Sequence, residues 1–170
     1  LTVGEWWHLL GTSGWAAPAL PVNAHGKGVG RNDAIAVASR IVAHGAVPAP
    51  GGLGMLLAAP TIAVHGSQEQ IDRYVLPIVT GQHAWCQLFS EPGAGSDLAG
   101  LGTRAMKDGD EWVVNGQKVW TSGAQNADLG IMLVRTGEDP GKAGITMMVM
   151  PMHQPLITIN MLWIMEFTGI

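Results

Sequence analysis

The sequence WCQLFSEPGAGSD occupies residues 85–97 and divides the chain into two dissimilar parts. Its first five residues form an apolar run typical of a buried strand. The run passes directly into a loop that holds two glycines, a proline, two serines and two acids. From spacing alone, this loop is either a plain surface turn or a loop shaped to lie against a ligand, because glycines leave backbone N–H groups without side-chain cover.

Helical periodicity dominates the residues before this stretch. Residues 5–10 favour one helix, and a second is expected over about 53–65, with a disturbance at Pro60. The strongest helix start is at Ser67, because Ser67 and Gln70 form a capping-box pattern ahead of apolar residues at helical spacing. This part of the chain is therefore predicted to be helical.

A further helix is expected over the sequence DAIAVASRIVAHG, which occupies residues 33–45. Asn32 is a suitable N-cap for this helix, and Gly45 is a suitable stop. Several apolar residues recur at a spacing that places them on one face of the helix. These residues are Ala34, Ile35, Ala38, Ile41 and Val42.

Strand periodicity dominates the residues after this stretch. The pairs Asp108-Gly109 and Asn115-Gly116 both favour the tight turns of hairpins, and they would separate TRAMK, EWVV and QKVW into three strands. Three more strands are expected over LGIMLVR, GITMMVM and LITIN, which occupy residues 129–135, 144–150 and 156–160. Helices followed by strands predict an α+β chain with segregated layers. Because no strand precedes HGKGVG, at residues 25–30, this segment is not interpreted as a phosphate-binding loop.

The composition excludes several classes of protein. The chain has 170 residues, of which 47% are hydrophobic and 13% are charged, and this balance is typical of a folded globular protein. The net charge is -4 and the nine basic residues form no cluster, so nucleic-acid binding is not expected. No apolar run approaches the roughly 20 residues of a membrane span.

The single cysteine, Cys86, rules out an intramolecular disulfide and is interpreted as a small buried hydrophobic residue. This fits a reducing compartment, and a cytoplasmic location is predicted. The chain begins at Leu1 rather than Met, so the prediction leaves open a targeting segment that precedes it.

A second polar segment, VWTSGAQNAD, occupies residues 119–128. A planar cofactor could lie against the ring of Trp120 while Thr121 or Ser122 hydrogen-bonds its polar rim. The alternative is a core tryptophan followed by an ordinary polar turn.

Taken together, WCQLFSEPGAGSD, DGDEWVVNGQKVWTSGAQNAD and GITMMVMPM resemble the middle domain of acyl-CoA dehydrogenases, which bind FAD. The segments GWAAPALPVNAHGKGVG and LAAPTIAVHGSQEQIDRYVLPIVTGQ look like the N-terminal helical domain of the same family. The resemblance implies a partial helical N-terminal domain over residues 1–81 and an antiparallel β-barrel-like middle domain over residues 82–160. Residues 161–170 would then be a truncated tail.

The resemblance also implies a set of cofactor-binding residues. Ser90 would meet the pyrimidine side of the isoalloxazine, Trp120 would flank the flavin ring, and Ser122 would hydrogen-bond near N5 and O4. Ser96 would lie near the pyrophosphate of FAD and near the acyl-CoA thioester, which makes it a substrate-binding residue as well. The whole implied set is Gln87, Leu88, Phe89, Ser90, Gly95, Ser96, Trp120, Thr121 and Ser122.

The implied reaction is the α,β-dehydrogenation of an acyl-CoA thioester, in fatty acid metabolism. The family carries its catalytic carboxylate and most of its subunit contacts in a C-terminal domain, for which this chain has no matching sequence, so no catalytic residue is assigned. Glu166 is not taken as the base, and Glu91 is interpreted as a structural hydrogen-bonding acid. The implied partners are an acyl-CoA substrate, an electron-transfer flavoprotein or similar acceptor, and a second copy in a homo-oligomer.

Two alternatives stay open beside an acyl-CoA dehydrogenase fragment that binds FAD. One is a non-catalytic truncated subunit that acts as an interaction module by pairing with a full-length one. The other is a related acyl-CoA oxidase or nitroalkane oxidase, which keeps the fold and changes the chemistry.

Overall fold

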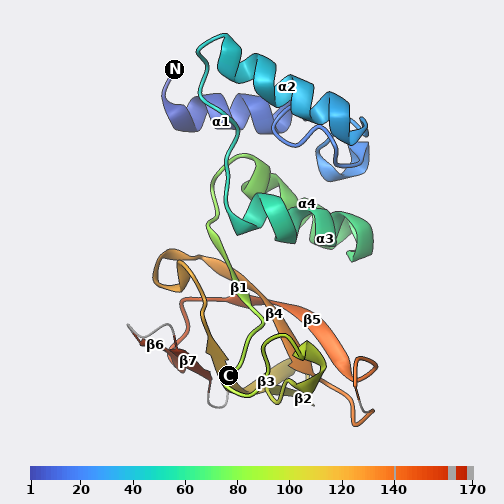
Figure 1. Ribbon diagram of the computed structural model, residues 1–170, viewed down its shortest axis with the longest axis vertical. Coiled ribbons are helices and arrows are strands. Elements are labelled where there is room, and N and C mark those ends of the chain that lie inside the picture. Colours follow the sequence, from blue (N-terminus) through green and yellow to red (C-terminus); the bar gives the residue numbers. More distant parts are fainter. Residues whose placement is uncertain (140, 161–163, 168–170) are drawn as a thin grey trace. The chain divides into compact units, whose positions relative to one another are not determined.

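The structure is a computed structural model that describes residues 1–139, 141–160 and 164–167 (Figure 1). It contains two compact units, one over Leu1–Ala84 and the other beginning at Trp85. Helices make up the first unit and strands the second, which confirms the predicted α+β class. Among the described residues, no helix combines the length and the apolar character that crossing a membrane requires.

The first unit is built around helix α4, which buries four apolar side chains and packs against α1 and α3. Its capping box is confirmed, because Ser67 Oγ accepts from the amide of Gln70 and the Gln70 side chain accepts from the amide of Ser67. The elements of this unit are α1 (Val3–Thr12), the 3₁₀ turn η1 (Val22–Ala24), α2 (Arg31–Ala43), the π-helical turn η2 (Gly54–Ala58), α3 (Ala59–His65) and α4 (Gln68–Val79).

The disturbance predicted at Pro60 is confirmed. The π-helical turn η2 ends at Ala58, and Pro60 lies in the first turn of α3. Helical backbone precedes the proline as well, and the amide of Ala59 donates to the carbonyl of Gly54, five residues back. This wider turn accommodates Pro60, whose ring would clash with the carbonyl four residues back in a regular α-helix. The chain therefore changes helical geometry just before the proline and then continues as a regular helix.

Helix α2 differs from the prediction in two respects. It begins at Arg31 with Gly30 as the N-cap, so the prediction of Asn32 as N-cap was wrong. Gly30 keeps an extended backbone while Asn32 is already within the helix, and a cap residue must itself be non-helical. The apolar face is also largely exposed, since Ile35 and Val42 are 55% and 57% accessible. Gly45 follows the C-cap at a φ of +72°, as predicted for a stop.

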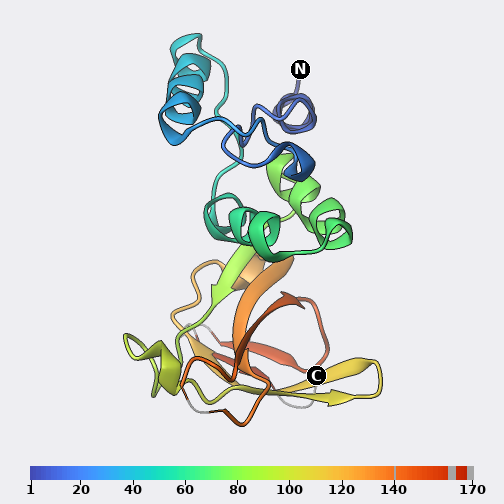
Figure 2. The ribbon, with the colours of Figure 1, turned by 90° about the vertical axis from the view of Figure 1, so that its right-hand side faces the viewer.

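The second unit is a curled sheet with the strand order β1-β4-β2-β3-β7-β6, in which β5 pairs with β4. Figure 2 shows that its strands curve around a shared interior. Most pairs are antiparallel, as predicted, but β1 and β2 both run parallel to β4. The strands are β1 (Trp85–Leu88), β2 (Arg104–Asp108), β3 (Glu111–Val119), β4 (Leu129–Arg135), β5 (Ile145–Pro151), β6 (Ile157–Asn160) and β7 (Ile164–Phe167).

One predicted hairpin is confirmed and the other was wrong. Asp108 pairs with Glu111, so the two turn residues are Gly109 and Asp110, one position later than the predicted Asp108-Gly109. Gly109 has a φ of +60°. At Asn115-Gly116, by contrast, β3 continues without a turn. Gly116 is needed there because Thr103 lies where a Cβ atom would stand, so the glycine marks a close approach rather than a change of direction.

Strand β7 lies in the tail, where no strand was predicted, and it pairs with β3 on one side and β6 on the other. Glu166 is part of this strand and is opposite Gln117 in register. The remaining tail positions, 161–163 and 168–170, lie outside the described residues.

The interior of the second unit contains Cys86, which is fully buried beside Met152 with 3.6 Å between the two sulfur atoms. Burial raises the pKa of the Cys86 thiol to about 12, so the thiol stays protonated and unreactive. This confirms the interpretation of Cys86 as a buried hydrophobic residue.

Candidate functional site

The two polar segments meet where β3 ends. The amide of Val119, the last residue of β3, donates to the carbonyl oxygen of Ser90 over 2.9 Å. Ser90 opens the first polar segment, and Val119 is the first residue of the second, directly before Trp120. The hydrogen bond therefore brings the beginnings of both segments side by side within the second unit.

The first segment forms a compact loop after β1. The amide of Glu91 donates to the carbonyl of Ala94, and the amide of Ala94 donates back to the carbonyl of Glu91, at 2.9 and 3.1 Å. Ala94 is buried beneath this turn, while Gly95 and Ser96 are exposed. The turn therefore presents the predicted residues Gly95 and Ser96 on its accessible side.

A buried ion pair joins this loop to β3. The ammonium of Lys118 lies 2.8 Å from the Glu91 carboxylate, and the Lys118 side chain is wholly inaccessible. The same ammonium donates to the carbonyls of Phe89 and Leu133, at 3.1 and 2.7 Å. All three N–H donors of the lysine are therefore used.

The Glu91 carboxylate closes the loop from the other side. Its oxygens accept from the amides of Gly102 and Thr103, at 2.6 and 3.0 Å. Burial alone would raise the pKa of Glu91, but the hydrogen bonds from Lys118, Thr103 and Gly102 outweigh burial and lower the pKa below 4.5. Burial lowers the pKa of Lys118, and the neighbouring carboxylate opposes that shift. The interpretation of Glu91 as a structural acid agrees with these contacts.

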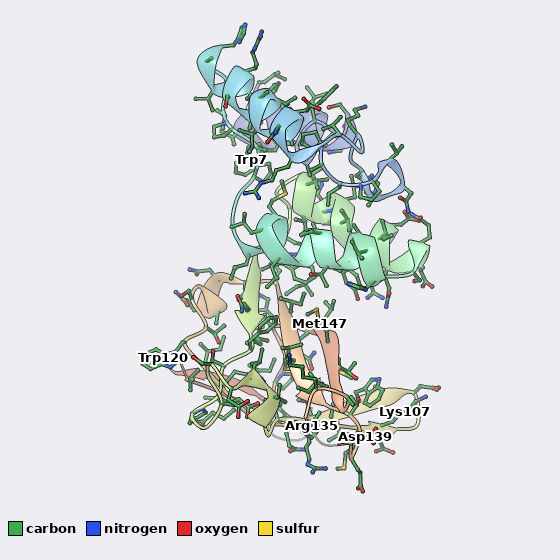
Figure 3. The ribbon with its side chains drawn as sticks, turned by 45° about the vertical axis from the view of Figure 1, so that its right-hand side comes forward. Trp7, Lys107, Trp120, Arg135, Asp139 and Met147 are labelled. Carbon is green, nitrogen blue, oxygen red and sulfur yellow. The ribbon has the colours of Figure 1, made fainter. Side chains whose placement is uncertain are left out.

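Arg135 at the end of β4 holds the later part of the loop. Its guanidinium donates to the carbonyls of Ala99 and Leu101, at 2.9 and 3.4 Å. It also donates to the carbonyls of Asp139 and Gly141 in the turn before β5, at 3.1 and 3.3 Å. Figure 3 shows Arg135 and Asp139 next to each other. The loop is thus tied to the sheet near both of its ends.

Trp120 has an unusual backbone for a large residue. Its φ is +60°, in the left-handed region that costs a non-glycine residue roughly 1–2 kcal/mol. Its side chain is 76% accessible, so burial of the indole does not offset that cost. Figure 3 shows the ring at the edge of the second unit, pointing away from it. Backbone strain combined with an exposed aromatic ring is typical of functional sites.

The residues after Trp120 have different environments. Thr121 is only 3% accessible, and its hydroxyl has no hydrogen-bond partner among the residues that the structure describes. Ser122 is exposed, and its amide donates to the carbonyl of Trp120 over 3.1 Å. A buried hydroxyl without a partner is costly, which makes Thr121 a candidate to meet a ligand.

The predicted residues in β1 and directly after it differ in their exposure to solvent. Leu88 is fully buried in the interior of the sheet, so its side chain is unavailable to a ligand. Gln87 and Phe89 are partly accessible, and the carbonyl of Phe89 is used by Lys118. Ser90 is also partly accessible.

Two residues of this region were missed from the sequence, Lys118 and Arg135. A signal for Lys118 exists, because side chains on a strand alternate between faces and Val114 and Lys118 therefore share the inward face of β3. A lysine at an inward position requires a buried partner. Nothing in the sequence distinguishes Arg135, because its partners are backbone carbonyls.

Comparison with known proteins agrees with this geometry. The family model described as "Acyl-CoA dehydrogenase, N-terminal domain" matches residues 2–82. The model described as "Acyl-CoA dehydrogenase, middle domain" matches residues 86–165, which include both polar segments. The chain belongs to the acyl-CoA dehydrogenase family. This is a family of flavoprotein oxidoreductases, as the resemblance predicted.

Several acyl-CoA dehydrogenases are similar to this chain. FadE34 of Mycobacterium tuberculosis is 51% identical over 113 residues, which are 66% of this chain and 16% of the relative. IpdE1 of the same organism is 34% identical over 165 residues, which are 96% of this chain and 42% of the relative. The chain therefore spans less than half the length of these curated acyl-CoA dehydrogenases.

Solved structures are likewise similar to nearly the whole of this chain, which covers less than half of each of them. The ChsE4-ChsE5 complex from Mycobacterium tuberculosis matches with a TM-score of 0.76 and 32% identity, over 98% of this chain and 45% of that chain. The Tcur3481-Tcur3483 steroid ACAD matches with a TM-score of 0.77 and 29% identity, over 99% of this chain and 46% of that chain. An FAD complex of PigA shares the fold, with a TM-score of 0.72 and 21% identity.

Proposed function

We propose that this chain carries the flavin-contacting part of an FAD-dependent acyl-CoA dehydrogenase, which catalyses the α,β-dehydrogenation of an acyl-CoA thioester. The observation that supports the proposal most directly is the hydrogen bond between Val119 and Ser90. It places the loop after β1 beside the strained, exposed Trp120. A flavin needs an aromatic surface and polar rim contacts together, and these two segments supply both.

The donor set of the site suits FAD. The chain has few basic residues, so backbone amides and hydroxyl groups would have to hold the anionic pyrophosphate. The turn that presents Gly95 and Ser96 offers such groups. The buried Thr121 hydroxyl, which has no partner in the described part of the chain, would gain one from a ligand.

In this assignment each residue keeps the role that the family resemblance implied. The Trp120 ring would flank the isoalloxazine, and the Ser90 and Ser122 hydroxyls would hydrogen-bond its pyrimidine side and its N5/O4 edge. The Ser96 hydroxyl would lie near the pyrophosphate and the thioester. FAD supplies the hydride acceptor when bound, while these residues orient it.

The proposed partners are an acyl-CoA substrate, an electron-transfer flavoprotein or similar acceptor, and a second subunit. No residue of this chain is assigned as the base that removes the α-proton. A cytoplasmic location stays a prediction.

FAD binding to the 170-residue chain tests the proposal. We expect the chain to quench and shift the flavin signal on titration, because the flavin ring would stack on Trp120. The double variant Trp120→Ala/Ser90→Ala should raise the Kd for FAD by about tenfold or more, which corresponds to roughly 1.4 kcal/mol. Trp112→Ala is the matched control, because it removes a partly exposed tryptophan at the other end of β3.

Two results would contradict the proposal. One is a folded chain whose addition leaves the flavin spectrum unchanged. The other is a double variant that binds FAD as tightly as Trp112→Ala does, because the site would then lie elsewhere.

A further inference from the structure

Lys118 connects three separate parts of the second unit through one side chain. Its ammonium donates to the carbonyl of Phe89 just after β1, to the carbonyl of Leu133 in β4 and to the carboxylate of Glu91 in the loop. Lys118 itself belongs to β3. Since the ammonium is wholly inaccessible, water cannot replace any of these acceptors.

The loop is closed through the same ion pair. Glu91 binds Lys118 near the start of the loop and accepts from the amides of Gly102 and Thr103 at its end. The position of the intervening turn, with Gly95 and Ser96 on its accessible side, therefore depends on the Lys118–Glu91 pair. Arg135 holds the carbonyls of the later part of the loop, and among the residues that the structure describes it makes no hydrogen bond to the beginning of the loop.

The second polar segment is coupled to the same lysine by sequence adjacency. Val119 follows Lys118 and donates its amide to Ser90, and Trp120 then turns into the left-handed conformation. A shift of Lys118 along or out of the strand would move this hydrogen bond and the Trp120 turn together. Both polar segments are thus linked to one buried cation.

We propose that Lys118 is a positioning residue of the flavin site: its contacts with Phe89, Glu91 and Leu133 set the loop after β1 and the Trp120 turn in register with each other. The proposal rests on the function proposed above. Lys118 does not touch the cofactor in this assignment. It acts through Ser90, Ser96 and Trp120.

A purely stabilising role explains the pair poorly. Taking a lysine and a glutamate out of water is costly, and apolar residues of similar size often replace a buried ion pair with little change in stability. What apolar residues lack is a directed contact with three acceptors. Removing both charges should therefore disturb the positions of the loop after β1 and the Trp120 turn more than it lowers the stability of the chain.

The test uses the double variant Lys118→Met/Glu91→Gln of the 170-residue chain. This variant leaves no unpaired buried charge, so it is expected to fold, whereas Lys118→Met alone leaves Glu91 without its cation. Lys107→Met is the matched control, because Lys107 is an exposed lysine on β2. Three quantities are measured: unfolding in urea, hydrogen exchange of the ligand-free chain, and the Kd for FAD.

We expect the double variant to stay folded with a urea midpoint above that of Lys118→Met alone, because it leaves no unpaired charge, and yet to bind FAD about tenfold more weakly than the wild type. Exchange should accelerate at the amides of Gly102, Thr103 and Val119, and amides shared between β4 and β5 should keep their protection. Lys107→Met should match the wild type in all three measurements. A role in stability alone would instead accelerate exchange across the whole sheet.

Failure of this inference is distinguishable from failure of the proposed function. If the wild-type chain binds FAD and the double variant binds it equally well, Lys118 is not a positioning residue and the proposed function stands. If the wild-type chain binds no FAD, the proposed function fails. Hydrogen exchange then decides alone whether Lys118 positions the two segments, and exchange that is unchanged or raised throughout the unit overturns the inference.

Discussion

At the scale of single residues, the second unit concentrates its polar contacts on a few charged side chains. Lys118 and Arg135 together bind six backbone carbonyls, and Glu91 binds two backbone amides. Loop backbone that is buried must find partners, and long charged side chains reach across several strands to supply them. These three charged side chains therefore hold the loop in place.

The ionisation of Glu91 predicts a dependence of stability on pH. Its pKa in the folded chain lies below the ordinary value of 4.5, so the stability that it contributes is present above about pH 4.5 and is lost as the pH falls through the lower, folded-state pKa. The free energy of unfolding should therefore decrease as the pH falls below about 4.5. In Lys118→Met/Glu91→Gln this decrease should be shallower, as measured by urea unfolding at each pH. An unchanged slope in the double variant would show that other carboxylates cause the acid sensitivity.

At the scale of elements, β3 is the strand that organises the site. It pairs with β2 along one edge and with β7 along the other, and its last two residues carry the contacts to the loop. Its continuity through Asn115-Gly116 is what allows Trp112 near one end and Trp120 beyond the other to belong to one extended segment. A turn at Asn115-Gly116 would reverse the chain and remove Lys118 from its place.

Gly116→Ala is predicted to destabilise the chain by about 1–3 kcal/mol, which is the usual cost of forcing extra volume into a packed site. The added Cβ would meet Thr103, including its backbone, which cannot rotate away. Gly95→Ala is the control, because a Cβ there meets nothing within 4 Å and its stability should change by less than about 0.5 kcal/mol. Urea unfolding of both variants checks this, and equal stabilities would mean that the strand relaxes freely around Gly116.

At the scale of the whole chain, the two units differ in what they contribute. The helical unit buries the apolar face of α4, while the strand unit carries both polar segments and all of the contacts described for the site. The chain has nine basic and thirteen acidic residues, so its net charge does not attract an anionic cofactor. In the proposed function, backbone amides and hydroxyl groups would therefore hold the pyrophosphate of FAD.

This balance of charge predicts that FAD binding depends weakly on salt. Raising the NaCl concentration from about 0.05 M to about 0.5 M screens interactions between exposed charges but hardly affects short hydrogen bonds. The Kd for FAD should therefore change by less than about threefold, measured by flavin fluorescence titration. An increase above about tenfold would indicate that lysine and arginine side chains hold the pyrophosphate.

The sequence alone determined the helix-then-strand order, the capping box at Ser67 and the hairpin after Asp108, because each depends on residues close together in the chain. It also determined the family, through the combination of several segments that are separated in the chain. It predicted the loop and the Trp120 segment as candidates for one site. It placed a turn at Asn115-Gly116 that does not exist, and it missed Lys118 and Arg135.

Those features were decided only by the tertiary structure. Gly116 is a glycine because of Thr103, and Lys118 is buried because Glu91 and two carbonyls from other segments surround it. The propensities of neighbouring residues carry no information about such contacts, since the partners come from distant parts of the chain. A glycine beside a distant backbone looks the same in sequence as a glycine in a turn, and a lysine with three buried acceptors looks the same as one in water.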